Sequence, residues 1–423
     1  MRRKRFRPRA VTRGRSRPRA VVAGLAVIVV VVVVAVVGYV AVQLLRPVPA
    51  MAVTPSPARL RALPGVPPRP AWPGQGQAAV GVPGIGMLAA RGGSRPTPIA
   101  SVAKIMTAYV ILRDHPLLTG GSGPAITVTA ADVAVYARDK SQGQSVVKVA
   151  AGEKLSERQA LEAMLIPSGN NIAVLLAGWD AGSQTAFVAK MNAVARALGL
   201  DHSRYADPSG FDPATVSTAS DQLRLALRAL QIPVFGQIVA MPQVTLPVAG
   251  LAYNVNSALG HDGIAGVKTG SSPQAGGCLV FSAIKTVAGT RATIVGVVLA
   301  VRPTTARPSE LAGVISASEN LLGSVSGDLE HVEVVTSGTV LGRVHSAWTT
   351  GPAAVAATGL TATGWPGTPV MVTVSSRPLA RTIRQGQPIA LATVTVGSSV
   401  SHITLDASRA VRPPSVRWLL TRL

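Results

Sequence analysis

An almost unbroken apolar run from Val21 to Val42 limits most strongly what this chain can become. At 1.5 Å per residue, about 22 helical residues cross a hydrocarbon core of about 30 Å. A secretory signal has a shorter apolar region of about 7–15 residues, so we expect an uncleaved transmembrane anchor over 21–45. Ala50 and Ala52 leave cleavage open, and a buried core helix is the other alternative.

Basic residues are concentrated before this run. Ten Lys and Arg residues lie between Arg2 and Arg19, whereas the first acidic residue is Asp114. Such a block binds nucleic acid or lies beside a membrane, and the adjoining apolar run favours the membrane. We therefore expect residues 1–20 to be a cytoplasmic tail and everything after residue 45 to lie outside the membrane. No nucleic-acid partner is predicted.

The composition offers little for metal chemistry. Cys278 is the only cysteine, so the chain has no internal disulfide and no cysteine metal cluster. The six histidines show none of the paired spacings that bind zinc on a helix. We predict neither a metal nor a cofactor.

The rest of the chain changes character twice. Residues 46–77 are rich in Pro, Ala and Gly and read as an extended linker. Residues 78–325 mix strand alternation with helical periodicity, including a helix over 101–113 and a hairpin over 278–301. Residues 326–423 hold short alternating runs separated by Gly, Pro and Ser. The fold class is thus an α/β (α+β) domain followed by a small all-β module.

A serine three residues before a lysine on a helix places both side chains on one face. The amine takes the hydroxyl proton only if burial or a nearby cation keeps it neutral. The chain holds three copies of this pattern, and at least two of them carry no catalytic meaning. The copies are Ser101/Lys104, Ser145/Lys148 and Ser282/Lys285.

Local context separates the three copies. The segment from Ser145 to Lys148 is β-branched, and the segment from Ser282 lies in the expected hairpin, where a spacing of three points side chains to opposite faces. Only Ser101 opens a predicted helix, after Pro96 and Pro98. A nucleophile at such a helix start gains from its free N–H groups and dipole.

Two further motifs follow in order. Ser168-Gly-Asn170 lies at a break in a helical stretch, and Lys268-Thr269-Gly270 precedes the first strand of the hairpin. Each motif alone has an ordinary reading, as a turn or a solvated strand end. The ordered triple is the signature of β-lactamases and penicillin-binding proteins.

With these motifs, the chain resembles the low-molecular-mass penicillin-binding proteins, the D-alanyl-D-alanine carboxypeptidases. The likeness covers about 78–325 and includes Ser217-Thr-Ala-Ser-Asp and Gly266-Val-Lys-Thr-Gly. Ser-Gly-Asn stands where class A β-lactamases have Ser-Asp-Asn, and no Glu-x-x-Leu-Asn segment is present. Both departures favour a carboxypeptidase. The resemblance implies a β-lactamase/transpeptidase-like fold, with an antiparallel sheet flanked by helices.

The resemblance also implies a role for each motif residue on peptidoglycan stem peptides, with β-lactams as covalent inhibitors. Ser101 is the nucleophile and Lys104 the general base. Ser168 relays a proton, and Asn170 orients Lys104 and binds the substrate amide. The remaining residues bind the terminal carboxylate (Lys268, Thr269), let the substrate backbone approach (Gly270) or supply oxyanion-hole N–H groups (Ser101, Ser271).

Three other functions stay open. A transpeptidase or DD-endopeptidase would use the same residues with an amine acceptor or a cross-linked substrate. A non-catalytic sensor would bind β-lactams or muropeptides without releasing D-Ala. A basic membrane adaptor would not be acylated at all, and the ordered triple argues against it.

Overall fold

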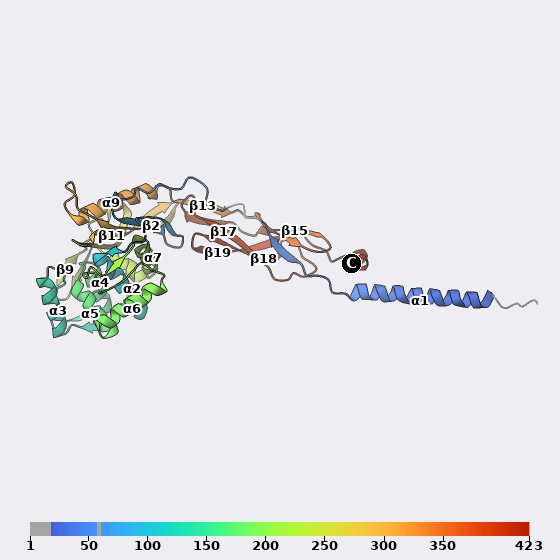
Figure 1. The fold of residues 1–423 in the computed structure, drawn as a ribbon, viewed down its shortest axis with the longest axis horizontal. Helices are drawn as coiled ribbons and strands as arrows, with labels where there is room; N and C mark the ends of the chain where they lie inside the picture. The colour runs from blue at the N-terminus through green and yellow to red at the C-terminus, as the bar shows by residue number, and fades with distance from the viewer. Residues whose placement is uncertain (1–17, 57–60, 423) are drawn as a thin grey trace, which may run out of the picture.

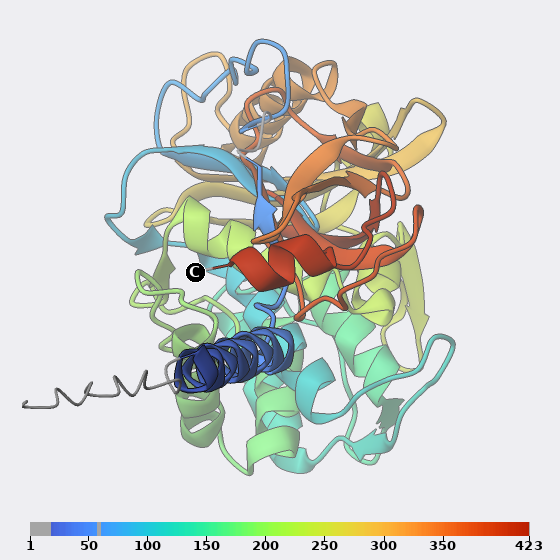
Figure 2. The same ribbon diagram turned by 90° about the vertical axis from the view of Figure 1, so that its right-hand side faces the viewer.

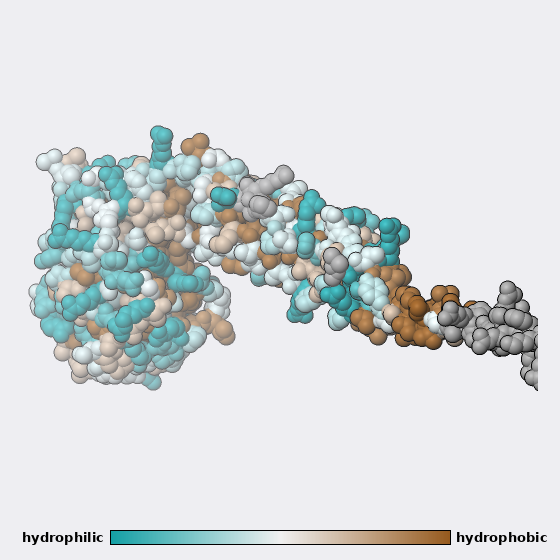
Figure 3. All heavy atoms as spheres, turned by 45° about the vertical axis from the view of Figure 1, so that its right-hand side comes forward, coloured by the Kyte–Doolittle hydropathy of each residue, from teal (hydrophilic) through white to brown (hydrophobic). Residues whose placement is uncertain are grey.

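The computed structural model describes residues 18–56 and 61–422 and is elongated (Figure 1). A rounded mixed α/β part lies at one end, a narrow β-rich part in the middle, and helix α1 (Pro18–Leu45) at the other end. Helix α1 is long and apolar enough over Val21–Leu45 to cross a membrane. Its apolar surface stands out from the more polar remainder of the chain (Figure 3).

A five-stranded antiparallel sheet organises the α/β part, in the order β10-β11-β12-β2-β3. The predicted hairpin is confirmed, with its turn at Ala288 and Gly289, both at positive φ. Cys278 and Val280 face one side and Leu279 and Phe281 the other, so both faces are buried. The strands are β10 (Ile264–Ser272), β11 (Gly276–Val287), β12 (Thr290–Val301), β2 (Gln77–Val82) and β3 (Gly86–Arg91).

Helices cover both faces of this sheet. Helix α9 (Glu310–Ser326) packs on β11 and β12 on one side, and α7 (Ala219–Ala229) packs on β12, β2 and β3. The helical stretch that contains Ser168 breaks there as predicted, into α4 and α5. The remaining helices are α2 (Lys104–Asp114), α3 (Ala130–Ser141), α4 (Glu157–Leu165), α5 (Asn170–Ala181), α6 (Gln184–Ala197) and α8 (Pro233–Val239).

The C-terminal part is all-β, as predicted. Its six-stranded sheet runs in the order β1-β14-β15-β19-β18-β17, with β13 and β16 as a separate pair. Its first strand comes from the segment expected to be a linker, because Ala52–Pro55 pairs with β14. The strands are β13 (Glu330–Val335), β14 (Val340–His345), β15 (Thr350–Ala356), β16 (Leu360–Gly364), β17 (Val370–Ser375), β18 (Pro388–Val396) and β19 (Ser399–Ala407).

Direct contacts join the α/β part to the β-rich part. Buried Trp365 donates from Nε1 to the carbonyl of Val325 at 2.9 Å, at the end of α9. The Ser398 N–H donates to the Ile85 carbonyl at 2.8 Å, and its hydroxyl to the Gly84 carbonyl at 2.9 Å. The tip of the β18–β19 hairpin therefore rests on the β2–β3 turn.

Short elements complete the chain. Helix α10 (Val416–Thr421) lies against the C-terminal end of α1, which we call the foot of α1 (Figures 1 and 2). The small strand pairs are β4 (Thr97–Pro98) with β7 (Val216–Ser217), β5 (Ala125–Thr127) with β6 (Lys154–Ser156), and β8 (Gln243–Leu246) with β9 (Gly250–Tyr253).

Candidate active site

Ser101 lies in a 3₁₀ turn, Ala100–Ala103, that leads directly into α2 at Lys104. The turn places the two side chains together, with Lys104 Nζ 2.8 Å from Ser101 Oγ. Ser101 is partly exposed, whereas Lys104 is fully buried. A substrate can therefore reach the hydroxyl, while the amine behind it is shielded from water.

Two further acceptors fix the position of the Lys104 amine. It donates to Asn170 Oδ1 at 2.6 Å and to the Ser209 carbonyl at 3.1 Å. A neutral amine has two N–H donors for these two oxygens, which leaves its lone pair to face Ser101 Oγ. Residues far apart in sequence thus converge on one nitrogen.

The surroundings of Lys104 favour its neutral form. Burial lowers its pKa well below the usual value, and the nearby Lys268 cation lowers this pKa further. The Asp207 carboxylate acts in the opposite direction and raises the pKa of Lys104. Perturbed amines of this kind are typical of catalytic bases.

The second motif forms the junction between α4 and α5. Ser168 has φ +66°, a left-handed conformation that is uncommon for a residue with a side chain, and it is 4% exposed. Asn170 begins α5 and donates from Nδ2 to Gln144 Oε1 at 2.6 Å. Because this bond orients the amide, Asn170 Oδ1 points at Lys104.

The third motif lies on β10, the edge strand of the sheet, which packs against the Ser101 turn. A Cβ on Gly270 would come within 2.9 Å of the Ser101 nitrogen, so only glycine fits at this spacing. The backbone of Gly270 and Ser271 thus runs beside the nucleophile. Lys268 and Thr269 are buried, and burial lowers the pKa of Lys268 to about 7.

The structure joins Ser101, Lys104 and Asn170 by hydrogen bonds, places Gly270 beside the Ser101 nitrogen, and separates the two decoys. Ser145 and Lys148 lie in an irregular segment rather than a helix. Ser282 and Lys285 lie on β11, where Ser282 is buried and Lys285 is partly exposed. The Ser145 carbonyl nevertheless accepts the Asn170 N–H at 2.8 Å, so this decoy segment supports the site through its backbone.

The sequence did not predict that the loop over residues 207–215 contributes to the site. Buried Asp207 accepts hydrogen bonds from the Ser209 hydroxyl at 2.6 Å, the Thr215 hydroxyl at 2.6 Å and the Phe211 N–H at 3.0 Å. This network fixes the Ser209 carbonyl that Lys104 contacts. The sequence showed only a turn signal at Asp207-Pro-Ser-Gly, which gives no sign of its partners.

Other reactive groups do not join the cluster. Cys278 is buried, and burial raises the pKa of its thiol to about 12. Within residues 18–56 and 61–422, no three His, Cys, Asp or Glu side chains gather as metal ligands would.

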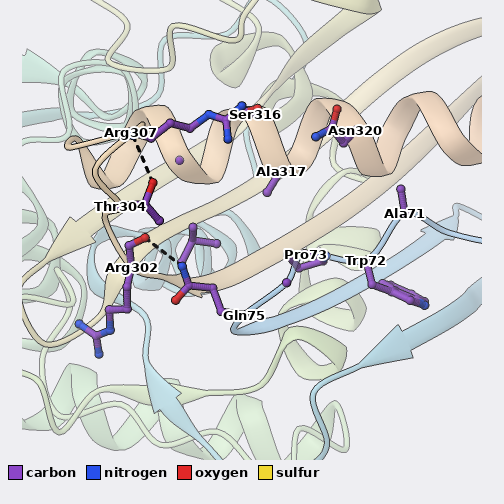
Figure 4. A pocket seen from close by; sticks show the side chains of 13 residues that line it. Ala71, Trp72, Pro73, Gln75, Arg302, Thr304, Arg307, Ser316, Ala317 and Asn320 are labelled. Atoms are coloured by element: carbon purple, nitrogen blue, oxygen red, sulfur yellow. Dashed lines mark hydrogen bonds between the residues drawn. The ribbon is translucent and has the colours of Figure 1, made fainter.

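A surface cavity of about 580 Å³ lies outside the cluster, between residues 71–75, the end of β12 and α9 (Figure 4). Arg302 forms part of its wall and donates to the carbonyls of Pro273 at 2.5 Å and Gln274 at 2.8 Å. These bonds brace the turn after Ser271, so the cavity wall supports the end of the β10 edge strand.

Comparisons with known proteins agree with this geometry. A family model described as D-alanyl-D-alanine carboxypeptidase matches residues 86–302. A D-alanyl-D-alanine endopeptidase of Pseudomonas aeruginosa is 35% identical over 191 residues, which cover 44% of this chain and 58% of the relative. A D-alanyl-D-alanine carboxypeptidase of a Streptomyces species is 33% identical over 228 residues, covering 50% and 75%. The chain thus spans little more than half the length of the Pseudomonas relative.

Solved structures show the same fold. Penicillin binding protein 5 of Haemophilus influenzae aligns with a TM-score of 0.58 at 21% identity, over 82% of this chain and 100% of that one. The Streptomyces K15 DD-transpeptidase aligns with a TM-score of 0.53 at 25% identity, over 62% and 100%. The first likeness extends into the β-rich part, because the α/β part alone makes up less of the chain.

Proposed function

Because this chain belongs to the D-alanyl-D-alanine carboxypeptidase family, we propose that it removes the terminal D-Ala from peptidoglycan stem peptides through an acyl-enzyme on Ser101. One observation carries this proposal. The Lys104 amine is fully buried, has a lowered pKa and lies 2.8 Å from the Ser101 hydroxyl. A neutral amine at this distance accepts the hydroxyl proton as the oxygen attacks.

Acylation would begin with attack of Ser101 Oγ on the carbonyl of the penultimate D-Ala. Lys104 takes the proton from Oγ, and a proton passes through Ser168 to the nitrogen of the leaving D-Ala. The carbon–nitrogen bond then breaks, leaving the peptide as an ester on Ser101. Asn170 holds Lys104 in place during these steps through the 2.6 Å bond.

The edge strand would bind and polarise the substrate. The N–H groups of Ser101 and Ser271 form the oxyanion hole, which is supported by the close approach of Gly270 to the Ser101 nitrogen. Lys268 and Thr269 bind the terminal carboxylate, as a cation and a hydroxyl should. Water then hydrolyses the ester and releases the shortened peptide.

A second activity is supported by the relatives. The Pseudomonas protein described above and an Escherichia coli protein, 32% identical over 198 residues, are both named D-alanyl-D-alanine endopeptidase. The same residues cut a cross-link if the leaving amine belongs to a neighbouring stem peptide. DD-endopeptidase activity is therefore the second candidate.

The domain organisation and topology belong to the same proposal. Residues 1–20 are a cytoplasmic tail, 21–45 the single membrane anchor, and 46–77 a connecting segment. The penicillin-binding domain (78–325) and the β-rich module (326–423) lie outside the membrane. The ten basic residues before the anchor support this orientation. β-Lactams are expected covalent inhibitors, and peptidoglycan stem peptides the substrates.

Product analysis on the detergent-solubilised full chain tests the activity. We expect release of free D-Ala from a pentapeptide ending in D-Ala-D-Ala, together with covalent labelling by a fluorescent penicillin. Mass spectrometry of a cross-linked muropeptide dimer measures the endopeptidase reaction in parallel. Labelling without release of D-Ala or cleavage of the dimer would instead identify a non-catalytic sensor.

Replacing the buried carboxylate near the base should shift the pH dependence of acylation. Acylation needs neutral Lys104, so its rate rises as the pH passes through the pKa of this lysine. Asp207 raises that pKa. In Asp207→Asn, the rise should therefore move to lower pH. The rate of penicillin labelling between pH 5 and 9 measures this shift.

The exposed Asp201 offers a matched control, since Asp201→Asn also removes one carboxylate but lies outside the loop. We expect its pH profile to overlay the wild type. A shift of the Asp207→Asn profile to higher pH, or no shift, would contradict the conclusion that the Asp207 carboxylate raises the pKa of Lys104.

A further inference from the structure

One end of the six-stranded sheet faces the foot of α1. Antiparallel pairing brings six strand ends to this side: the starts of β1, β15 and β18 and the ends of β14, β17 and β19. The chain enters β1 only seven residues after α1 ends at Leu45. Figure 2 looks onto this end, with α1 pointing toward the viewer and α10 lying across it.

The loops at this end are rich in arginine and free of acidic residues. Segments 46–51, 346–349, 376–387 and 408–422 contain no Asp or Glu, and the acidic residue nearest to them in the sequence is Asp406. Within the part of the chain that the structure covers, none of their guanidinium groups pairs with a carboxylate. We call these eight residues the arginine collar: Arg46, Arg377, Arg381, Arg384, Arg409, Arg412, Arg417 and Arg422.

Hydrogen bonds attach the collar to the foot of α1. Arg422 donates from Nη2 to the carbonyls of Gln43 at 2.7 Å and Arg46 at 2.5 Å. The Tyr39 hydroxyl donates to the Leu420 carbonyl at 3.0 Å. The position of α1 in a membrane therefore fixes the position of the collar.

Two tryptophans lie among the arginines. Trp348 and Trp418 meet edge to face, with ring centroids 5.8 Å apart. Trp348 Nε1 donates to the Arg412 carbonyl at 3.3 Å, and both rings remain partly exposed. Tryptophan is enriched where a membrane meets water, because its ring is apolar and its N–H is polar.

The length of α1 determines where the collar lies relative to the membrane surface. Val21–Leu45 contains 25 residues. At 1.5 Å per residue such a helix is about 37 Å long, a few ångströms more than a hydrocarbon core of about 30 Å. When α1 spans the membrane, its outer end lies among the lipid headgroups, and the collar lies beside it.

We propose that the arginine collar binds the phosphate groups of anionic lipids in the outer leaflet, and so seats the β-rich part on the membrane surface. Guanidinium groups bind phosphate through paired N–H donors. Each basic residue near an anionic surface strengthens binding about fivefold. The proposal requires α1 to span the membrane but is independent of the catalytic chemistry.

The full chain in lipid nanodiscs tests this docking by amide hydrogen exchange. We compare nanodiscs of phosphatidylcholine alone with nanodiscs containing 30% phosphatidylglycerol. Anionic lipid should slow exchange at least about fivefold in residues 376–387, because several arginines share the headgroup contact. The triple variant R377Q/R381Q/R384Q should lose this protection, and so should the wild type at high salt.

The matched control neutralises three exposed arginines of the α/β part, as R91Q/R95Q/R291Q. This control should keep the full protection. Equal exchange in the two lipid mixtures, or unchanged protection in the collar triple, would overturn the proposal. Protection that appears with soluble polyphosphate in neutral nanodiscs, but not with anionic lipid, would assign the collar to an anionic wall polymer and also overturn it.

Discussion

Ser101→Ala should lower both penicillin labelling and release of D-Ala by at least about 10³-fold, because Ser101 supplies the hydroxyl that contacts Lys104. The variant should remain folded. It loses one hydrogen bond, the 2.8 Å contact with Lys104, which is worth about 1 kcal/mol. Fluorescent labelling on a denaturing gel measures acylation, and thermal unfolding checks the fold.

The chain supplies its own controls for this experiment. Ser145→Ala and Ser282→Ala alter the same Ser-x-x-Lys pattern at the two decoys. Both should be labelled at the wild-type level, because Ser145 lies in an irregular segment and Ser282 on a strand. Labelling that persists in Ser101→Ala but disappears in either control would move the nucleophile to that serine.

Lys104→Met should lower the rate of acylation by about 10²–10⁴-fold, the usual contribution of a general base. Methionine has a similar length and no ionisable group, so the cavity stays filled. Asn170 Oδ1 and the Ser209 carbonyl lose their donor, which destabilises the fold. Removing a fully buried amine relieves a desolvation cost and offsets this loss. We therefore expect the Tm to change by less than about 5 °C.

Stopped-flow labelling with a fluorescent penicillin gives the rate, and Lys148→Met serves as the control because Lys148 is exposed in a decoy. The control should react like the wild type. Should Lys104→Met retain wild-type acylation, another group would have to be the base. A large drop in the Tm of Lys104→Met would mean that its low acylation rate reflects unfolding. The acylation rate of Lys104→Gln, which keeps a hydrogen-bond donor, would then test whether Lys104 is the general base.

The sequence predicted the local elements of the site better than their assembly. The helix after Ser101, the break at Ser168 and the hairpin after Lys268 follow from periodicity and turn residues within single segments. The contacts of Lys104 with Asn170 and Ser209 join residues 66 and 105 positions away. Such pairings depend on how the helices pack against the sheet, which no local pattern encodes.

Strand β1 and the arginine collar also could not be predicted from the sequence, because both depend on contacts between distant segments. Ala52–Pro55 becomes a sheet strand only because β14 offers a free edge some 290 positions later, so its Pro-rich surroundings favoured a linker. The arginine collar is scattered over three segments in the sequence, 46–51, 376–387 and 408–422. It becomes one surface only through the antiparallel order of the six-stranded sheet.

The junction at Trp365 and Ser398 has a consequence for where in the cell wall the enzyme acts. Strand β19 has nine residues, and at about 3.3 Å per residue it extends about 30 Å along the long axis of the molecule (Figure 1). Direct contacts attach the β-rich part to α9 and to the β2–β3 turn. With α1 in the membrane, the β-rich part therefore holds Ser101 at a fixed height above the lipid. In the proposed topology, stem peptides at that height are within reach of Ser101, and stem peptides farther from the membrane are not.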